Sequence, residues 1–502
     1  MSTQITLLFL LFLASPSFQY PWTFDQNSVS DFFVNQTTNM NNFFQEQKTK
    51  VENLITSSYQ DAVKIKDSVN VYVESQQKKI AEDVNRYVDT VKDSGRKMTD
   101  SFSFTPESVT EGEKIENPDL ILSVPAIIQR NGYDCETHSV VSQGYVLNLH
   151  RIPHSKNSNH ISKKTVLLHH GLFASSADWI LNGPEKALAY VLSEAGYDVW
   201  MANVRGNKYS REHLSLKLDG KSYWNFSWHD IAEHDVPAVI DYIKKVKGSD
   251  SKLVYIGHSM GTTILFAMLA LKPEYNDILT AGVALAPVVF MSDIKSPLKS
   301  LSPIASNVAY MEMLYGSHEF IPKNSALGRI ASSCDVDNID GKVCKNIVFS
   351  VCGANEAQFN KTLLPVFLSH LGTGTSWKTV VHFAQIMEAE GKFQKFDYGA
   401  YYNNKQYGSD TPPAYDLGSI KLPIKLFWAR NDLLSSETDV MKLYNRLPKS
   451  TEVHMVPDPN FNHVDYLWAI DAPTLLNNKL VDTLERSFSD YFTLAARLLG
   501  TK

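Results

Sequence analysis

The chain has 502 residues with a formal net charge of −6; 43% of the residues are hydrophobic and 20% are charged. This composition is typical of an ordinary globular protein with enough apolar residues to bury a sizeable core. The small acidic net charge argues against nucleic acid as a partner.

The first 19 residues have the pattern of a secretory signal peptide. Residues 5–14 form a short apolar core, and the small side chains of Ser15 and Ser17 follow where cleavage is expected, although no Lys or Arg precedes the core. The apolar run is too short to span a bilayer, and no later stretch of the sequence is long enough. The sequence therefore predicts a secreted protein, with the lysosome as the alternative, and no transmembrane segment.

Residues 20–116 are predicted to form an N-terminal helical extension and a linker. Between residues 44 and 91, apolar residues recur with the three-or-four spacing of one helical face, and Gly95 is the first Gly or Pro after them. This amphipathic helix either packs as a hairpin on itself or on the rest of the chain, or lies on a lipid surface. Its apolar face is rich in Val and poor in Leu, Trp and Phe, which favours packing.

From residue 117 onward, strand patterns alternate with helix patterns. This alternation predicts right-handed β–α–β units in a mostly parallel sheet, preceded by a hairpin around Gln143 and Gly144. The expected strands are 138–141, 145–152, 165–169, 197–204, 253–256 and 279–287, and the expected helices include 185–195, 230–247 and 262–271.

Residues 288–415 interrupt the alternation. They are predicted to be mainly helical and to form a cap or lid inserted into the sheet domain, because strand patterns resume at 421–428 and 452–456 and a helical region follows at 474–499. The predicted fold class is therefore α/β, with a core in residues 117–287 and 416–502.

The stretch around Ser259 makes this fold class more specific. A β-rich run enters the turn Gly257-His-Ser-Met-Gly261, and residues suited to a buried helix follow it. Gly-x-Ser-x-Gly between a strand and a helix is the nucleophile elbow of α/β-hydrolases, in which Gly257 and Gly261 are small because the two backbones crowd the strained serine. We interpret Ser259 as a nucleophile and residues 117–287 and 416–502 as an α/β-hydrolase core.

A serine hydroxyl needs a base to take its proton and a carboxylate to orient that base. In this fold the partners follow in the order serine, acid, histidine, each just after a strand. Asp432 follows the strand 421–428 and His463 follows the strand 452–456, so we predict these as acid and base. Asp439 begins a helical run and Asp465 is too close in sequence to His463, so both are weaker candidates for the acid.

The tetrahedral intermediate of ester hydrolysis needs two hydrogen-bond donors. The backbone N–H of Met260, directly after the nucleophile, is the first, and the second is expected from Leu172 in the loop after the strand 165–169. We expect His169 and His170 to shape this loop and His258 to pack inside the elbow. Neither a cofactor nor a metal is expected, because no His, Cys and Asp cluster has ligand spacing.

Cysteines and glycosylation sequons fit a secretory route. A Cys334–Cys344 disulfide is the preferred pairing among the four cysteines, and other pairings stay open. Asn35, Asn225 and Asn360 each begin a sequon and are candidate glycosylation sites.

Several blocks of sequence in one order closely resemble the acid lipase family, the animal gastric and lysosomal acid lipases. The blocks are residues 170–179, 195–207, 257–263, 369–376, 393–399 and 462–473, and the resemblance runs from about residue 117 to 480. It implies an α/β-hydrolase with a cap and lid acting on neutral lipid esters. It also implies the roles given above for Ser259, Asp432, His463, Leu172 and Met260, a Cys334–Cys344 bridge, and a free Cys352.

Three features depart from that family. Met260 replaces the usual Gln, and Arg430 stands where small residues are usual before the acid, while the 44–95 helix has no counterpart that we recognise.

From the motifs and the resemblance together, we predict a secreted or lysosomal lipase that hydrolyses triacylglycerols or cholesteryl esters at a lipid droplet or micelle surface. The alternatives are a lipase-like lipid carrier with little catalysis and a carboxylesterase acting on smaller esters.

Overall fold

The computed structural model describes residues 117–158, 160–248, 251–308, 311, 319–320 and 339–498. The predicted signal peptide, the 20–116 extension with its amphipathic helix, Asn35 and Cys334 lie outside these residues.

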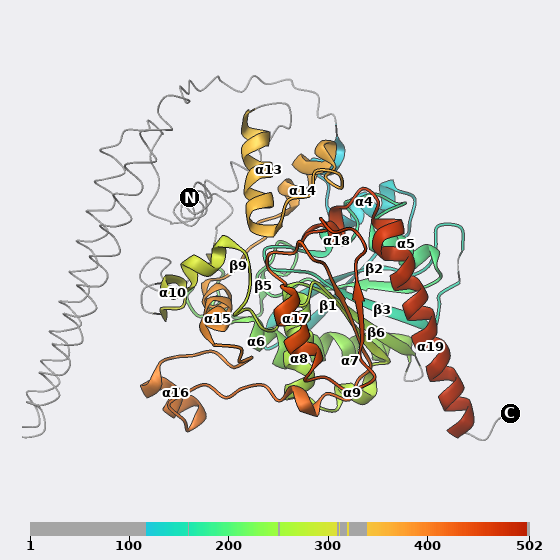
Figure 1. The fold of residues 1–502 in the computed structure, drawn as a ribbon. Helices are drawn as coiled ribbons and strands as arrows, with labels where there is room; N and C mark the ends of the chain where they lie inside the picture. The colour runs from blue at the N-terminus through green and yellow to red at the C-terminus, as the bar shows by residue number, and fades with distance from the viewer. Residues whose placement is uncertain are drawn as a thin grey trace, which may run out of the picture. The chain divides into compact units, whose positions relative to one another are not determined.

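The described residues are organised around a nine-stranded sheet (Figure 1). Its strand order is β1-β2-β4-β3-β6-β7-β10-β11, with β5 paired to β2. The strands from β4 to β11 in that order run parallel, whereas β1, β2 and β5 are joined by antiparallel pairing. Their bounds are β1 Glu136–Ser142, β2 Tyr145–Ile152, β3 Lys164–His169, β4 Asp198–Met201, β5 Glu212–His213, β6 Lys252–His258, β7 Ala281–Leu285, β10 Ile424–Trp428 and β11 Glu452–Met455. The expected α/β class is confirmed.

Helices cover both faces of this sheet, because the connections between parallel strands place helices there. Alternate residues of each strand point to opposite faces and pack against different helices. In β6, Leu253 and Tyr255 pack with the helices α7, α8 and α17, whereas Val254 and Ile256 pack with α4, α5, α18 and α19. The helix bounds in the core are α4 Val124–Arg130, α5 Leu188–Glu194, α6 Trp228–Asp230, α7 Val236–Lys247, α8 Met260–Leu271, α9 Tyr275–Ile278, α17 Glu437–Tyr444, α18 Asp465–Trp468 and α19 Asn478–Leu498.

Two expected helices differ in detail. The helix expected at 185–195 begins only at Leu188, because Lys186 and Ala187 first turn back to the Gly183 carbonyl. The helix expected at 230–247 begins at Trp228 and contains a π-helical segment, Ile231–Asp235, before α7. Pro237 lies in the first turn of α7 and has no N–H to donate, so the regular hydrogen-bond ladder is interrupted there.

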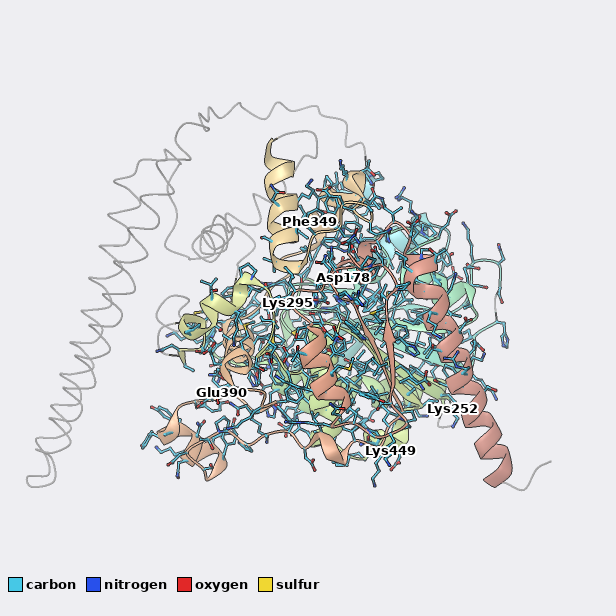
Figure 2. The ribbon with its side chains drawn as sticks, in the orientation of Figure 1. Asp178, Lys252, Lys295, Phe349, Glu390 and Lys449 are labelled. Atoms are coloured by element: carbon cyan, nitrogen blue, oxygen red, sulfur yellow. The ribbon has the colours of Figure 1, made fainter. Side chains whose placement is uncertain are left out.

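The chain between β7 and β10 supplies no strand to the main sheet among its described residues. It holds α10 Ser302–Ala305, α13 Ile339–Cys352, α14 Leu364–His370, α15 Trp377–Glu388, α16 Ala400–Tyr407 and a small separate sheet of β8 Glu319–Phe320 with β9 Thr375–Ser376. Arg211 of the core forms a bidentate ion pair with Glu319 at 2.7 and 2.8 Å, which ties this insertion to the sheet domain. Figure 2 places Phe349 on α13 of the insertion.

Within the residues that the structure describes, no helix has the length and apolar character needed to cross a membrane. The same residues contain no group of three or more His, Cys, Asp or Glu side chains arranged to hold a metal ion.

Candidate active site

Ser259 lies in a tight turn between the carboxyl end of β6 and the start of α8. Its φ of 53° and ψ of −117° are unusual for a residue with a side chain, so the turn is strained. A Cβ on Gly261 would lie 2.2 Å from the carbonyl oxygen of His169, and one on Gly257 would lie 2.6 Å from the carbonyl of Gly261. Only glycine fits at either position, and the close approach places Ser259 beside the end of β3.

The structure brings the hydroxyl of Ser259 to His463 and His463 to Asp432. His463 Nε2 lies 2.8 Å from Ser259 Oγ, and His463 Nδ1 lies 2.9 and 3.0 Å from the two carboxylate oxygens of Asp432. Asp432 and His463 are 1% and 4% exposed. Three side chains far apart in sequence therefore form one hydrogen-bonded chain at the carboxyl edge of the parallel strands.

The carboxylate of Asp432 is held by its own loop. Its Oδ1 accepts hydrogen bonds from the backbone N–H groups of Leu434 and Ser435, both at 2.8 Å. The two competing aspartates point elsewhere: Asp439 accepts from the N–H of Asp293 at 2.9 Å, and Asp465 accepts from the side chain of Asn355 at 2.8 Å. Neither hydrogen-bonds the His463 ring.

The loop after β3 passes directly beside the nucleophile. A Cβ built on Gly171 would lie 3.3 Å from Cβ of Ser259 and 3.7 Å from its Oγ, so the Gly171–Leu172 peptide borders the reacting hydroxyl. Met260, buried at 1% exposure, begins α8 on the other side of Ser259. Its backbone N–H belongs to the first turn, where helix N–H groups have no partner within the helix.

His170 holds the Gly171–Leu172 peptide in place. Its Nε2 lies 3.2 Å from the backbone N–H of Val204, which can only donate, so Nε2 accepts and Nδ1 carries the proton. Nδ1 then donates to the Gly171 carbonyl at 2.8 Å. Burial lowers the pKa of His170 to about 4, which keeps the ring neutral and this tautomer in place above that pH.

His258 packs inside the elbow, as expected, and also forms a hydrogen bond that we did not predict. Its Nε2 donates to the carbonyl of His463 at 2.9 Å, while the N–H of His463 donates to the carbonyl of Cys352 at 3.1 Å. The backbone of His463 is thus held on both sides. Burial lowers the pKa of His258 to about 3, so the ring stays neutral.

The remaining predicted sites are only partly within the described residues. Asn225 is exposed and Asn360 is half-buried, and glycosylation of both remains a prediction. Cys344 lies on α13, where the structure does not describe its side chain, so the Cys334–Cys344 bridge also remains a prediction. Cys352 is a free thiol, as the family resemblance implies.

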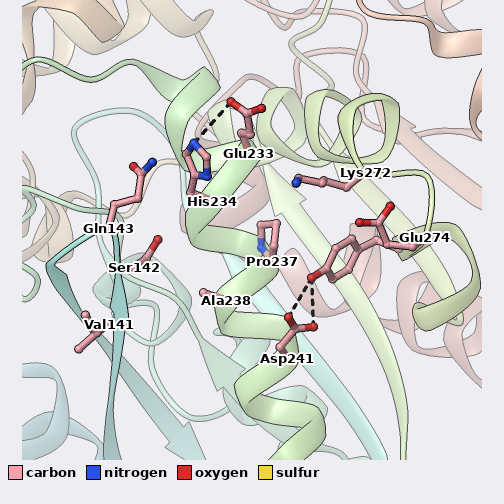
Figure 3. Close-up of a pocket in the computed structure, with 11 residues that line it drawn as sticks. Val141, Ser142, Gln143, Glu233, His234, Pro237, Ala238, Asp241, Lys272 and Glu274 are labelled. Carbon is pink, nitrogen blue, oxygen red and sulfur yellow. Dashed lines mark hydrogen bonds and ion pairs between the residues drawn. The ribbon is translucent and has the colours of Figure 1, made fainter.

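A surface cleft of about 370 Å³ lies away from these residues, between the β1–β2 turn and α7 (Figure 3). None of the residues that line it belongs to the Ser259–His463–Asp432 chain. Its walls are polar: His234 Nε2 lies 3.5 Å from a carboxylate oxygen of Glu233, and the Tyr275 hydroxyl hydrogen-bonds Asp241. An open polar cleft is poorly suited to an apolar ligand.

A mostly parallel sheet with a strained serine after one strand, an aspartate after a later strand and a histidine after the last one defines an α/β-hydrolase. The sequence matches the family described as the alpha/beta hydrolase fold over residues 164–469, and the partial alpha/beta-hydrolase lipase region over residues 124–183. The chain belongs to the α/β-hydrolase family and, within it, to the family of the gastric triacylglycerol lipases.

The relatives are spread across animals. Bovine (Bos taurus) gastric triacylglycerol lipase is 37% identical over 380 residues, covering 74% of this chain and 94% of that one. Lipase 1 of Drosophila melanogaster is 35% identical, covering 76% and 83% of the two chains. Lipase lipl-1 of Caenorhabditis elegans is 35% identical, covering 73% and 92%.

Proposed function

We propose that this protein is a lipase that hydrolyses ester bonds of neutral lipids through a Ser259–His463–Asp432 triad. The observation that carries the proposal is the 2.8 Å hydrogen bond from Ser259 to His463, continued to Asp432. A base within hydrogen-bond reach of a hydroxyl, itself oriented by a carboxylate, is the arrangement that activates a serine.

In this mechanism Ser259 Oγ attacks the ester carbonyl while His463 Nε2 takes its proton. The tetrahedral intermediate collapses when His463 returns that proton to the leaving alcohol, and an acyl-enzyme remains on Ser259. Water, deprotonated by the same histidine, then attacks the acyl carbon and releases the fatty acid. Asp432 keeps the Nδ1 proton in place and stabilises the charged ring throughout.

We assign the oxyanion donors to the backbone N–H groups of Met260 and Leu172. The planar peptide that joins Gly171 to Leu172 carries the Gly171 carbonyl on one side and the Leu172 N–H on the opposite side. Because His170 Nδ1 binds that carbonyl, it fixes the direction in which the N–H points. His170 is therefore assigned as a positioning residue for the second donor, and the replacement of the family's Gln by Met260 leaves the first donor intact.

The His170 assignment predicts a difference between two substitutions. The amide nitrogen of Asn can take the place of Nδ1 and still donate to Gly171, whereas the amide of Gln reaches the place of Nε2 instead. We expect H170Q to lower kcat by about 10- to 100-fold, since complete loss of an oxyanion donor costs about 10²–10³, and H170N to lower it much less. Steady-state kinetics on one soluble ester, with KM as the control, measure the difference; equal losses would contradict the assignment.

Neutral lipid is the proposed substrate class, either triacylglycerols or cholesteryl esters. The names of the relatives, among them gastric triacylglycerol lipases, support lipid esters, and the insertion between β7 and β10 supports a cap over the site. We further propose that the protein is secreted, with the lysosome as the alternative, on the basis of residues 1–19, and that it works at a lipid droplet or micelle surface.

The test of this function is release of fatty acid from emulsified triolein, compared with hydrolysis of tributyrin below and above its solubility limit. We expect release from triolein, and a rise in the tributyrin rate once droplets form, because a capped site responds to an interface. Hydrolysis of dissolved tributyrin with no rise on emulsification, and none of triolein, would instead indicate a carboxylesterase. No hydrolysis of either substrate from pH 4 to pH 8 would favour a lipid carrier.

A further inference from the structure

The segment Cys352–Asn355, at the end of α13, lies between the loop that carries Asp432 and the loop that carries His463. The Cys352 carbonyl accepts one hydrogen bond from each of the two loops: from the N–H of His463 at 3.1 Å and from the N–H of Leu433 at 3.4 Å. Although this segment belongs to the insertion, it touches the backbone on which the base and the acid depend.

The next two carbonyls of the segment extend the same connection. The Gly353 carbonyl accepts from the side-chain amide of Asn462 at 3.0 Å, and the Ala354 carbonyl accepts from that of Asn431 at 2.9 Å. Gly353 has a φ of 108°, and a Cβ there would lie 2.1 Å from the carbonyl oxygen of Asn431. The chain can pass this close to the acid loop only because position 353 is a glycine.

Asn355 completes the connection with a side chain. Its Nδ2 donates to Asp465 at 2.8 Å and to Asp458 at 3.0 Å. The same oxygen of Asp465 accepts from the N–H of Asn462 at 2.9 Å, and Asn462 Oδ1 accepts from the N–H of Asp465 at 3.0 Å, which closes a tight loop around His463.

This set of hydrogen bonds around His463 depends on the buried carboxylate of Asp465, which needs hydrogen-bond donors. Asn355, Asn462 and Asp465 are each no more than 3% exposed. Burial raises the pKa of Asp465 to about 7, so its carboxylate is costly to hold in this place. If the donor Asn355 is removed, the free-energy cost of burying the Asp465 carboxylate is no longer offset. We therefore expect the loop that carries His463 to shift.

We propose that Asn355 is a positioning residue for His463, and that the Cys352–Asn355 segment of the insertion sets the distance between the base and the Ser259 hydroxyl. The inference rests on the proposed ester hydrolysis, because positioning has a consequence only if His463 acts as the base. It makes the insertion part of the framework of the triad as well as a cover over the site.

A nearby residue provides a matched control. Gln358 lies three residues beyond this segment in the same insertion, is 8% exposed, and binds Asp471 through both ends of its amide, at 3.0 and 2.8 Å. It ties the insertion to the chain beyond the His463 loop, and its hydrogen bonds go to Ile470 and Asp471 rather than to either triad loop. Gln358→Ala therefore removes a comparable buried amide without releasing His463.

The first test compares Asn355→Ala with Gln358→Ala by kcat and KM on p-nitrophenyl butyrate and by melting temperature. We expect Asn355→Ala to lower kcat about tenfold or more with KM within about twofold, since a shift near 1 Å at a base can cost on the order of 10²-fold. Gln358→Ala should retain kcat within about twofold while its melting temperature falls to a similar degree. Equal kcat in the two variants would overturn the proposal.

Asp465→Ala removes both acceptor oxygens and so deletes the same contact from its other end, which covers the case in which Asn355→Ala does not fold. It should lower kcat to a similar extent, and the double variant should lose no more than the worse single variant, because both act on one contact. A fully multiplicative double variant, or an Asp465→Ala variant with the wild-type kcat, would overturn the proposal.

A second readout separates this inference from the proposed function. A fluorophosphonate labels a serine that has a competent base, whichever ester the enzyme prefers. If the wild type hydrolyses no ester, the proposed function fails, and the rate of Ser259 labelling still tests positioning: Asn355→Ala should be slower than Gln358→Ala by about tenfold. Equal labelling rates for these variants would refute the positioning role by itself.

Discussion

Ser259→Ala is expected to lower fatty-acid release from emulsified triolein by about 10⁴-fold or more, because the loss of a triad nucleophile removes the acyl-enzyme route. The residual rate reflects binding and the oxyanion donors, which do not depend on the hydroxyl. Alanine shares the Cβ of serine and meets the same strain at a φ of 53°, so the elbow should keep its shape. We expect the melting temperature to stay within a few degrees of the wild type.

The matched control for this experiment is Ser193→Ala. Ser193 is fully buried, whereas Ser259 is half-buried; Ser193 lies on α5 and donates its hydroxyl to the carbonyl of His154 at 2.8 Å. Its loss is expected to cost about 1 kcal/mol of unfolding free energy and to leave the rate unchanged. Retention of more than a tenth of wild-type activity in Ser259→Ala would show that another residue is the nucleophile.

Asp432→Asn is expected to lower kcat by about 10⁴-fold, by inverting the tautomer of the base. The backbone N–H groups of Leu434 and Ser435 both point at Oδ1 of this side chain, so the amide of asparagine should turn its oxygen to them and its NH₂ group to His463. His463 Nδ1 must then accept rather than donate, which moves the ring proton to Nε2. A protonated Nε2 cannot take the proton of Ser259.

The same substitution at a competing carboxylate is the control. Asp439 is as buried as Asp432, at 1% exposure, and its carboxylate accepts from the Ser436 hydroxyl and the N–H of Asp293 rather than from a histidine. Asp439→Asn should change kcat by less than about twofold, since it touches no group of the triad. If Asp439→Asn were the inactive variant and Asp432→Asn the active one, the assignment of the acid would be wrong.

The local features of this protein could be predicted from its sequence. Patterns within short stretches of sequence predict three features: the strand–turn–helix around Ser259, the hairpin at Gln143 and Gly144, and the alternation of strands and helices that builds the parallel sheet. The hydrogen-bonded contact of Asp432 and His463 with Ser259 also agrees with the sequence order, because the fold requires each partner of the serine to follow a strand, and few residues satisfy that order.

Some of the local detail did not follow from sequence patterns. The π-helical segment before α7 arises where Pro237 interrupts the hydrogen-bond ladder. The spacing of apolar residues does not distinguish a π-helical segment from an α-helix. The hydrogen bond from His258 to the His463 carbonyl joins residues 205 positions apart, and a histidine beside a nucleophile gives no sign of such a partner.

The sequence by itself thus determined the strained turn of Ser259, the order in which Asp432 and His463 follow their strands, and the parallel sheet that aligns them. Only the tertiary structure decided which residues hold the loop that carries His463 in place. Cys352, Gly353 and Asn355 hold the His463 loop chiefly through backbone carbonyls and one buried amide. Every residue has a carbonyl, so its partner depends on how distant segments pack and leaves no pattern in the sequence.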